Sequence, residues 1–311
     1  MIDVPLTVGP LGPETRGEAA IDPYRDKLNI LSLGAGVQSS TLALMGAYGV
    51  VDPFDHAIFA DTQSEPAGVY SWLATLRELI AEAPHPFPIH VVTAGNLTDD
   101  MLKLRTSKKT GQKYVRALIP AYFQKPDSKH GRGLLGRKCT AEYKVRALIR
   151  KQRELAKVPR ARKGVDIGVR CRVAIGISWD EVERMKPSTE PWAVNYWPLV
   201  ERKLTRQDCL DWMELMGFPK PPRSACVFCP FHSDAEWRRL RDEEPTEFQR
   251  AVRVDRELRA KAAQSTGTAK LAGDVFLHAS LKPLDQVDFG DLPDHAQASQ
   301  FGNDCTGLCG V

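Results

Sequence analysis

The sequence of 311 residues lacks an apolar run long enough to span a bilayer, which takes about 20 residues. Residues 1–27 also lack the basic and then apolar order of a signal peptide, and we expect them to form an N-terminal arm. The seven cysteines are too sparse for a disulfide framework. These absences predict a cytoplasmic protein without a membrane partner, whose cysteines are reduced thiols, metal ligands or catalytic groups.

Positive charge is abundant but concentrated in one segment. Between Leu102 and Arg172 there are 22 Lys or Arg against 4 Asp or Glu, a balance of +18, whereas the whole chain carries +4 and the remainder therefore −14. Such a block favours a polyanionic partner over an ordinary solvated surface. Nucleic acid, tRNA or DNA, is the first candidate, because Lys and Arg contacts to phosphates supply most of its non-specific affinity.

Short aliphatic segments alternate with helical patterns along the first two thirds of the chain. The alternation predicts an α/β fold with a doubly wound parallel sheet and a small cysteine-bearing C-terminal region. Residues 103–138 show little periodicity, and we expect a long mobile excursion there. Strands are expected at 28–33, 54–62, 87–95 and 172–178, and helices at 41–48, 69–83 and 139–157.

The stretch "LNILSLGAGVQSSTLALMGAYG" runs an apolar segment into a glycine-bearing turn and then into a helical pattern. Gly34 and Gly36 would let the backbone approach a phosphate, and Ser39 or Ser40 is placed to cap the helix. The N–H groups and dipole of a helix N-terminus suit an anion. An ordinary strand-to-helix turn explains the stretch equally well by itself.

Four segments, in this order, resemble one family. "SLGAGVQSS" resembles the PP-loop of the adenine-nucleotide α-hydrolase superfamily, in the variant of phosphoadenosine phosphosulfate (PAPS) reductase-like proteins, with Gln38 where most members have Asp. "ADTQSEP", "RKCTAEYK" and "IGISWDEVERM" are similar to later motifs of the same group. The resemblance spans roughly residues 28 to 235 and implies a nucleotide-binding domain over 28–216, with the basic excursion 102–172 inside it, followed by a C-terminal region over 217–311.

The resemblance implies a site for ATP or another adenine nucleotide. Asp61 or Thr62 would lie near the adenosine, although Asp61 could instead cap the following helix. Arg184 would bind the anionic end of the nucleotide and act in catalysis; the alternative is an exposed helix start with an ion pair. The amide of Gln38 holds Mg²⁺ less tightly than a carboxylate, so a role for Mg²⁺ stays open. The residues expected to bind the nucleotide are Ser32, Gly34, Gly36, Gln38, Ser39, Ser40, Asp61, Thr62, Gly176 and Glu181.

A Cys-x-x-Cys knuckle, Cys226 and Cys229, is followed by Pro230 and His232. Two thiolates at this spacing converge on one metal ion. The resemblance to PP-loop sulfur transferases implies a 4Fe–4S cluster held by Cys139, Cys226 and Cys229. Structural zinc, with Cys139 or His232 completing the set, is the alternative.

The chain ends in a glycine-flanked tail with Cys305 and Cys309. PAPS reductases carry a nucleophilic cysteine on a mobile C-terminal tail, and this tail is similar in placement but lacks their usual sequence. The thiol pair could carry a sulfur atom, form a disulfide after reducing a substrate, or bind metal. Cys171 and Cys209 stand among apolar residues and are expected to be buried and inert.

Three functions follow from these features. The first is a sulfur transferase that uses ATP and a sulfur donor to thiolate a nucleic acid or nucleobase. The second is a sulfonucleotide reductase that uses a tail cysteine and a thiol reductant. The third is a non-catalytic nucleic-acid-binding protein with a zinc knuckle. A homodimer is left open in each case.

Overall fold

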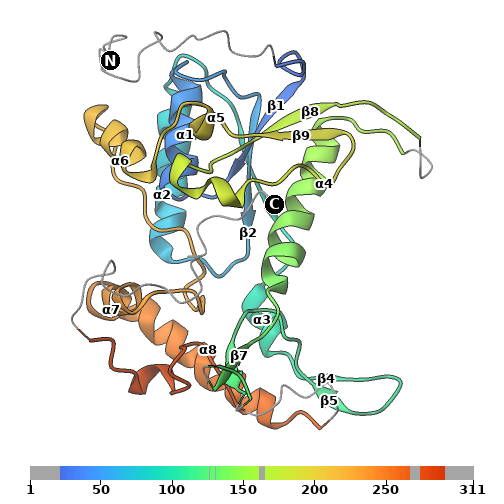
Figure 1. Ribbon diagram of the computed structural model, residues 1–311, viewed down its shortest axis with the longest axis vertical. Coiled ribbons are helices and arrows are strands. Elements are labelled where there is room, and N and C mark those ends of the chain that lie inside the picture. Colours follow the sequence, from blue (N-terminus) through green and yellow to red (C-terminus); the bar gives the residue numbers. More distant parts are fainter. Residues whose placement is uncertain (1–21, 126, 130, 161–164, 267–273, 291–311) are drawn as a thin grey trace.

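A parallel sheet forms the centre of the upper part of the protein (Figure 1). The computed structural model describes residues 22–125, 127–129, 131–160, 165–266 and 274–290. In these residues, five strands pair in the order β3-β2-β1-β8-β9, and every neighbouring pair is parallel. The strands are β1 (Leu28–Leu33), β2 (His56–Asp61), β3 (Ile89–Thr93), β8 (Cys171–Ile175) and β9 (Ala193–Tyr196). The predicted doubly wound α/β fold is confirmed.

Helices cover both faces of this sheet, which explains why its central strands are nearly continuous apolar runs. Leu31 and Leu33 point into one core cluster, whereas Ile30 points into the cluster on the opposite face, together with Leu148 of α4. The first face is covered by α1 (Val37–Ala47), α2 (Ala67–Ala81), α5 (Pro198–Glu201) and α6 (Arg206–Leu215), and the second by α4 (Arg146–Leu155).

The strand order reverses between β1 and β8. From β1 the chain moves outward through β2 to β3, and it later returns to the other side of β1 with β8 and β9. The loops at the carboxyl ends of β1 and β8 therefore run in opposite directions, and in open α/β sheets such diverging loops border a crevice. In open α/β sheets, ligands bind at such a topological switch point.

The lower part of the protein combines the basic excursion with the C-terminal region. Val115, Leu118 and Ile119 are buried in one apolar cluster with Trp237 and Val252. These residues of the excursion are therefore held in place, because they pack on helices that follow them by more than 100 residues. This part contains α3 (Leu97–Leu102), β4 (Arg105–Thr106), β5 (Lys113–Tyr114), β6 (Tyr122–Gln124), β7 (Arg132–Leu134), α7 (Asp234–Glu243), α8 (Pro245–Ala263), β10 (Val275–Phe276) and the 3₁₀ turn η5 (Leu284–Gln286).

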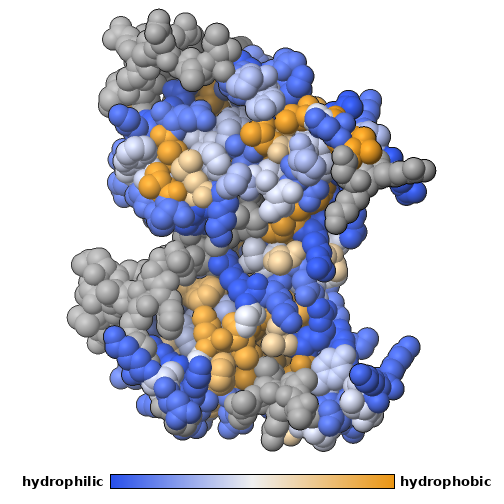
Figure 2. Space-filling view, turned by 45° about the vertical axis from the view of Figure 1, so that its right-hand side comes forward, coloured by the Kyte–Doolittle hydropathy of each residue, from blue (hydrophilic) through white to orange (hydrophobic). Residues whose placement is uncertain are grey.

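Two irregular helices adjoin the central sheet. The helix expected over 139–157 begins as a π-helix, η3 (Thr140–Val145), before it continues as α4. The strand β8 leads into a 3₁₀ helix, η4 (Trp179–Arg184). Figure 2 shows the surface narrowing between the upper and lower parts. Among the helices of the described ranges, none has the length and apolar character of a membrane span.

Candidate functional site

The loop Gly34–Gly36 carries the chain from β1 into α1 at the switch point. Ala35 adopts a left-handed backbone with φ of +58°. The helix begins at Val37 with Gly36 as its N-cap, and no described side chain caps it. The prediction that Ser39 or Ser40 caps this helix is wrong, because both serines lie inside its first turn. An N-terminus without a side-chain cap keeps its backbone donors available to an anion.

The two serines hold the loop and the helix in place. The Ser39 hydroxyl accepts a hydrogen bond from Gly34 N at 3.1 Å and donates to the Gly36 carbonyl at 3.4 Å. The fully buried Ser40 hydroxyl accepts from the indole of Trp72 at 2.8 Å. Ser39 therefore shapes the loop, and Ser40 anchors α1 to α2.

Gly176 closes the crevice on the β8 side. A Cβ atom at this position would lie 2.9 Å from both the N and Cα atoms of Ser39. Only glycine lets the end of β8 approach the first turn of α1 so closely. Gly176, one of the predicted nucleotide-binding residues, therefore lies against the first turn of α1.

Gln38 connects the loop side of the crevice to η4. Its Nε2 donates to Glu181 at 3.2 Å and lies 3.5 Å from the Ser178 hydroxyl. Glu181 also accepts from Arg184 at 2.5 Å. The i, i+3 ion pair is present, but its side chains are 9% and 17% exposed and so are largely sheltered. The charge of Arg184 is thus balanced by a carboxylate that also positions Gln38.

Asp61 ends β2 on the other side of β1. Its Oδ1 accepts from Gln63 N at 2.7 Å and from the Tyr70 hydroxyl at 2.9 Å. The N-cap of α2 is Pro66, so Asp61 does not cap that helix. Burial and the hydrogen bond to Asp61 raise the pKa of Tyr70 above its ordinary value, which keeps the phenol a donor.

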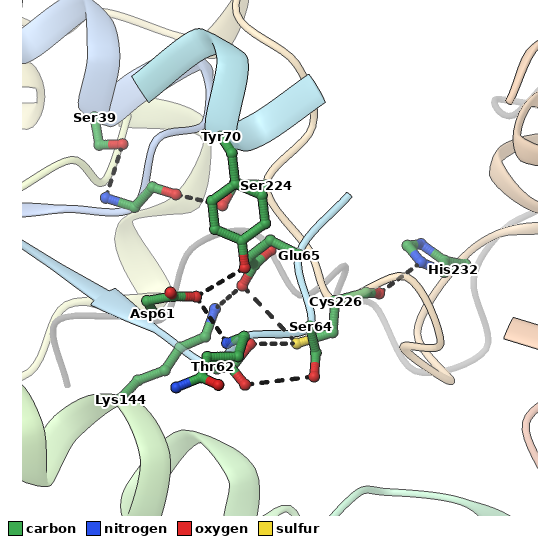
Figure 3. A network of polar contacts seen from close by, with 12 residues as sticks. Ser39, Asp61, Thr62, Ser64, Glu65, Tyr70, Lys144, Ser224, Cys226 and His232 are labelled. Atoms are coloured by element: carbon green, nitrogen blue, oxygen red, sulfur yellow. Dashed lines mark hydrogen bonds and ion pairs between the residues drawn. The ribbon is translucent and has the colours of Figure 1, made fainter. Parts of the chain in front are cut away.

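A buried polar cluster lies beside Thr62 (Figure 3). The Cys226 thiol is 3.3 Å from the Thr62 hydroxyl and 3.9 Å from Glu65 Oε1, and the same oxygen accepts from Lys144 at 3.2 Å. Burial and the carboxylate of Glu65 hold the pKa of Cys226 well above its ordinary value, while the Lys144 ammonium acts in the opposite direction. The arrangement favours a protonated thiol. The sequence motifs contain Glu65 and Lys144, but nothing in the spacing shows that they meet.

Ser224 joins this cluster to the glycine loop. Its hydroxyl donates to the Gly34 carbonyl, and its Cβ lies 3.5 Å from where a Cβ on Gly36 would be. Two residues further on, Cys226 contacts Thr62. The segment that opens the Cys-x-x-Cys knuckle therefore crosses the carboxyl ends of both β1 and β2 (Figure 3). Sequence reasoning missed Ser224, which no motif marks.

The predicted metal ligands are only partly brought together. Cys139 and Cys226 pack against the same apolar cluster, and Cys139 contributes to raising the pKa of Cys226. Cys229 is buried one turn beyond Cys226. Within the described ranges, no three Cys, His, Asp or Glu side chains are arranged to hold a metal ion. The geometry does not fit a cluster or zinc as it stands, and the ligand set stays a prediction.

The other cysteines and His232 have different surroundings. Burial lowers the pKa of His232 to about 3, and its Nε2 is 3.1 Å from the Cys226 carbonyl oxygen, so the ring faces backbone instead of sulfur. Cys171 and Cys209 are fully buried, and burial raises the pKa of each to about 12, as expected for inert thiols. Cys305 and Cys309 lie outside the described residues.

No family model matches the chain, and no curated protein matches its sequence. The class of protein therefore rests on the fold and the crevice. The parallel sheet with β1 at the switch point is consistent with a Rossmann-like or adenine-nucleotide α-hydrolase fold. A fold of this kind is compatible with nucleotide-binding enzymes.

Proposed function

We propose that the chain is a PP-loop-type enzyme that binds ATP in the crevice between β1 and β8 and uses it to transfer sulfur to a nucleic acid. The observation that carries the proposal is the glycine loop at the switch point, tied through Ser224 to the loop that bears Cys226. The glycine loop suits a phosphate chain. The Ser224 hydrogen bond ties the segment that leads to Cys226 to that loop.

Backbone groups are the main phosphate ligands in this proposal. The first turn of α1 has no side-chain cap, so its backbone N–H groups and the helix dipole favour an anion there. Gln38 and Arg184 line the same crevice from α1 and η4. Arg184 would exchange part of its contact with Glu181 for a phosphate oxygen when the nucleotide binds.

In the proposed reaction, an oxygen of the acceptor base attacks the α-phosphorus of ATP, and the bond to pyrophosphate breaks. A hydrosulfide donor then attacks the activated carbon, the bond to AMP breaks, and the sulfur stays on the base. The chain would bind the nucleotide, orient the base and exclude water during both steps. Because the ligand geometry does not fit a cluster as it stands, no step is assigned to a metal centre.

The exposed cations of the basic segment support a nucleic acid as the acceptor. They lie at the end of α3, on the β4–β5 hairpin and along α4, and include Lys103, Lys108, Lys109, Lys113, Arg146, Arg150 and Arg153. A small phosphorylated substrate would need far fewer positive charges. Contacts of this kind predict binding that weakens steeply as salt rises.

A second candidate, reduction of a sulfonucleotide, is favoured by one observation. Gln38 offers an amide where most superfamily members have a carboxylate, and here it bonds to Glu181. A site with fewer carboxylates around Mg²⁺ suits a reaction that does not split ATP. In that reaction a thiolate attacks the sulfur of the substrate, and the bond to the nucleotide phosphate breaks. A second thiol then attacks the sulfur of the first, so that sulfite leaves and a disulfide forms.

The test uses the full chain purified without oxygen, with iron, sulfide and zinc measured on the same sample. AMP and pyrophosphate are followed after addition of ATP alone, ATP with tRNA and ATP with DNA. We expect AMP formation that depends on one of the polynucleotides. Release of sulfite from a sulfonucleotide, with no AMP formed from ATP, would replace the first function with the second. Binding of polynucleotide with no effect of any nucleotide would leave only a binding protein.

A further inference from the structure

The rim of the crevice carries an exposed aromatic side chain that the proposed chemistry does not use. In the described residues, large hydrophobic side chains are exposed at Tyr70, Val91, Val165, Trp179, Val182 and Leu215. Three of these, Tyr70, Trp179 and Val182, lie just beyond the carboxyl ends of the central strands, on α2 and η4. Trp179 is 47% exposed, although the chain's other tryptophans are buried or half-buried.

The backbone beneath Trp179 is fixed. Trp179 N donates to the Leu204 carbonyl at 2.7 Å, and the preceding Ser178 is fully buried. The Ser178 hydroxyl is 3.5 Å from Gln38, in the first turn of α1. Trp179 thus projects from a rigid support immediately next to the nucleotide crevice. A rigid aromatic group loses little conformational freedom when it binds a flat partner.

The charges beside Trp179 are mixed. Asp180 and Glu183 are exposed beside it, and Asp180 also accepts from Arg206 N at 3.0 Å. Lys203 is exposed next to Leu204, whose carbonyl accepts from Trp179 N. The face of the indole itself is uncharged and suits the uncharged face of a base. The phosphates would instead lie along the cations of α4 and the β4–β5 hairpin.

We propose that Trp179 is the stacking platform for an unpaired base of the nucleic-acid acceptor, and that the substrate class is therefore single-stranded, looped or flipped-out nucleotides. This inference rests on the proposed function. In a duplex, both faces of a base are covered by its neighbours, so an aromatic ring can stack only on a base that has left the helix. Stacking of this kind tolerates any base sequence.

The experiment measures dissociation constants of the full chain for labelled single strands and for a blunt duplex of the same sequence, at several salt concentrations. Trp179→Ala is compared with Trp179→Phe, which keeps an aromatic face, and with Leu215→Ala, which removes another exposed apolar side chain. ATP affinity is measured separately for each variant. Because the chain has six tryptophans, stacking on Trp179 is read from the part of the fluorescence quenching by the single strand that is lost in Trp179→Phe.

We expect Trp179→Ala to bind single strands about 5- to 100-fold more weakly, with its ATP affinity and salt dependence unchanged. Trp179→Phe should retain most of the affinity, and Leu215→Ala all of it. The inference is overturned if Trp179→Ala binds single strands as tightly as the unaltered chain does. It is also overturned if the variant loses affinity for single strands and for the duplex by the same factor. If the unaltered chain binds no polynucleotide at all, the proposed acceptor fails together with this platform.

Discussion

The glycine crevice between β1 and β8 and the polar cluster at the end of β2 lie side by side at one edge of the sheet, but they are held together differently. The crevice depends on close backbone approach at Gly176 and on a loop shaped by Ser39. The cluster depends on two opposite charges, Glu65 and Lys144, whose side chains are 0% and 8% exposed. The crevice should therefore be sensitive to a substitution that adds side-chain volume, and the polar cluster to a substitution that removes a charge.

This difference bears on what each region can do. A site made of backbone donors binds an anion without much rearrangement, because its dipoles are already oriented. A buried ion pair contributes little net stability by itself but makes the loss of either partner costly. The crevice is therefore suited to recognition, and the cluster to holding the Cys226 loop in one position.

The largest effect is expected from Lys144→Met, which leaves the carboxylate of Glu65 buried without its counter-charge. We expect the free energy of unfolding to fall by about 3–5 kcal/mol, measured by urea denaturation. The double variant Lys144→Met/Glu65→Gln should recover a large part of this loss, since no charge then remains buried. A loss below about 1 kcal/mol in the single variant would contradict the buried-charge account.

Next in size is Gly176→Ala, which tests the volume-sensitive side. The added Cβ would lie 2.9 Å from the backbone of Ser39. We therefore expect the free energy of unfolding to fall by about 1–3 kcal/mol and ATP to bind more weakly. The matched control is Gly68→Ala in α2, where no atom lies within 4 Å of the added Cβ. Equal behaviour of the two variants would mean that the close approach does not matter.

A smaller effect is expected from Ser224→Ala, which removes the link between the two regions. Loss of the hydrogen bond to the Gly34 carbonyl should lower stability by about 1 kcal/mol. ATP affinity should fall and the reactivity of Cys226 toward a thiol reagent should rise, because both loops loosen together. Ser71→Ala, on the exposed face of α2, is the control. A change in only one of the two readouts would show that the regions are independent.

The smallest effect is expected from Ala35→Gly. Glycine relieves the left-handed strain at φ of +58°, but it removes a buried methyl group and gains entropy in the unfolded chain. These contributions nearly cancel, so the free energy of unfolding, measured by thermal denaturation, should change by less than about 0.5 kcal/mol. Ala43→Gly, within regular helix in α1, should cost about 1 kcal/mol or more. A large loss in Ala35→Gly would imply that its methyl group shapes the loop.

Features set by neighbouring residues were predictable from the sequence. The short apolar run of β1 and the glycines after it predict a strand and a turn, because both signals are local. The capping role of Ser39 was wrong, since the helix begins two residues before it, at Val37. Spacing alone did not show how far the first turn extends back into the glycine loop.

Features set by distant contacts were not predictable. Glu65 and Lys144 are 79 residues apart, and no periodicity connects them. The strand β6 in the basic excursion pairs with β10, which follows it by about 150 residues. Charged residues dominate the excursion. Its few apolar residues form part of a core only because α8 packs against them, and this contact cannot be predicted from the local sequence.

The π-helix η3 sets an angular relationship between the two parts of the molecule. A π-turn takes up one residue more than an α-turn, and each residue of an α-helix advances about 100° around the axis. If residues 140–145 formed an ordinary α-helix, the side chain of Cys139 would be rotated about the helix axis by about 100° relative to that of Leu148. The wide turn thus allows one continuous helix to present Leu148 to the sheet and Cys139 to the lower core. A one-residue insertion or deletion within η3 would change that phase while leaving every side chain of α4 intact.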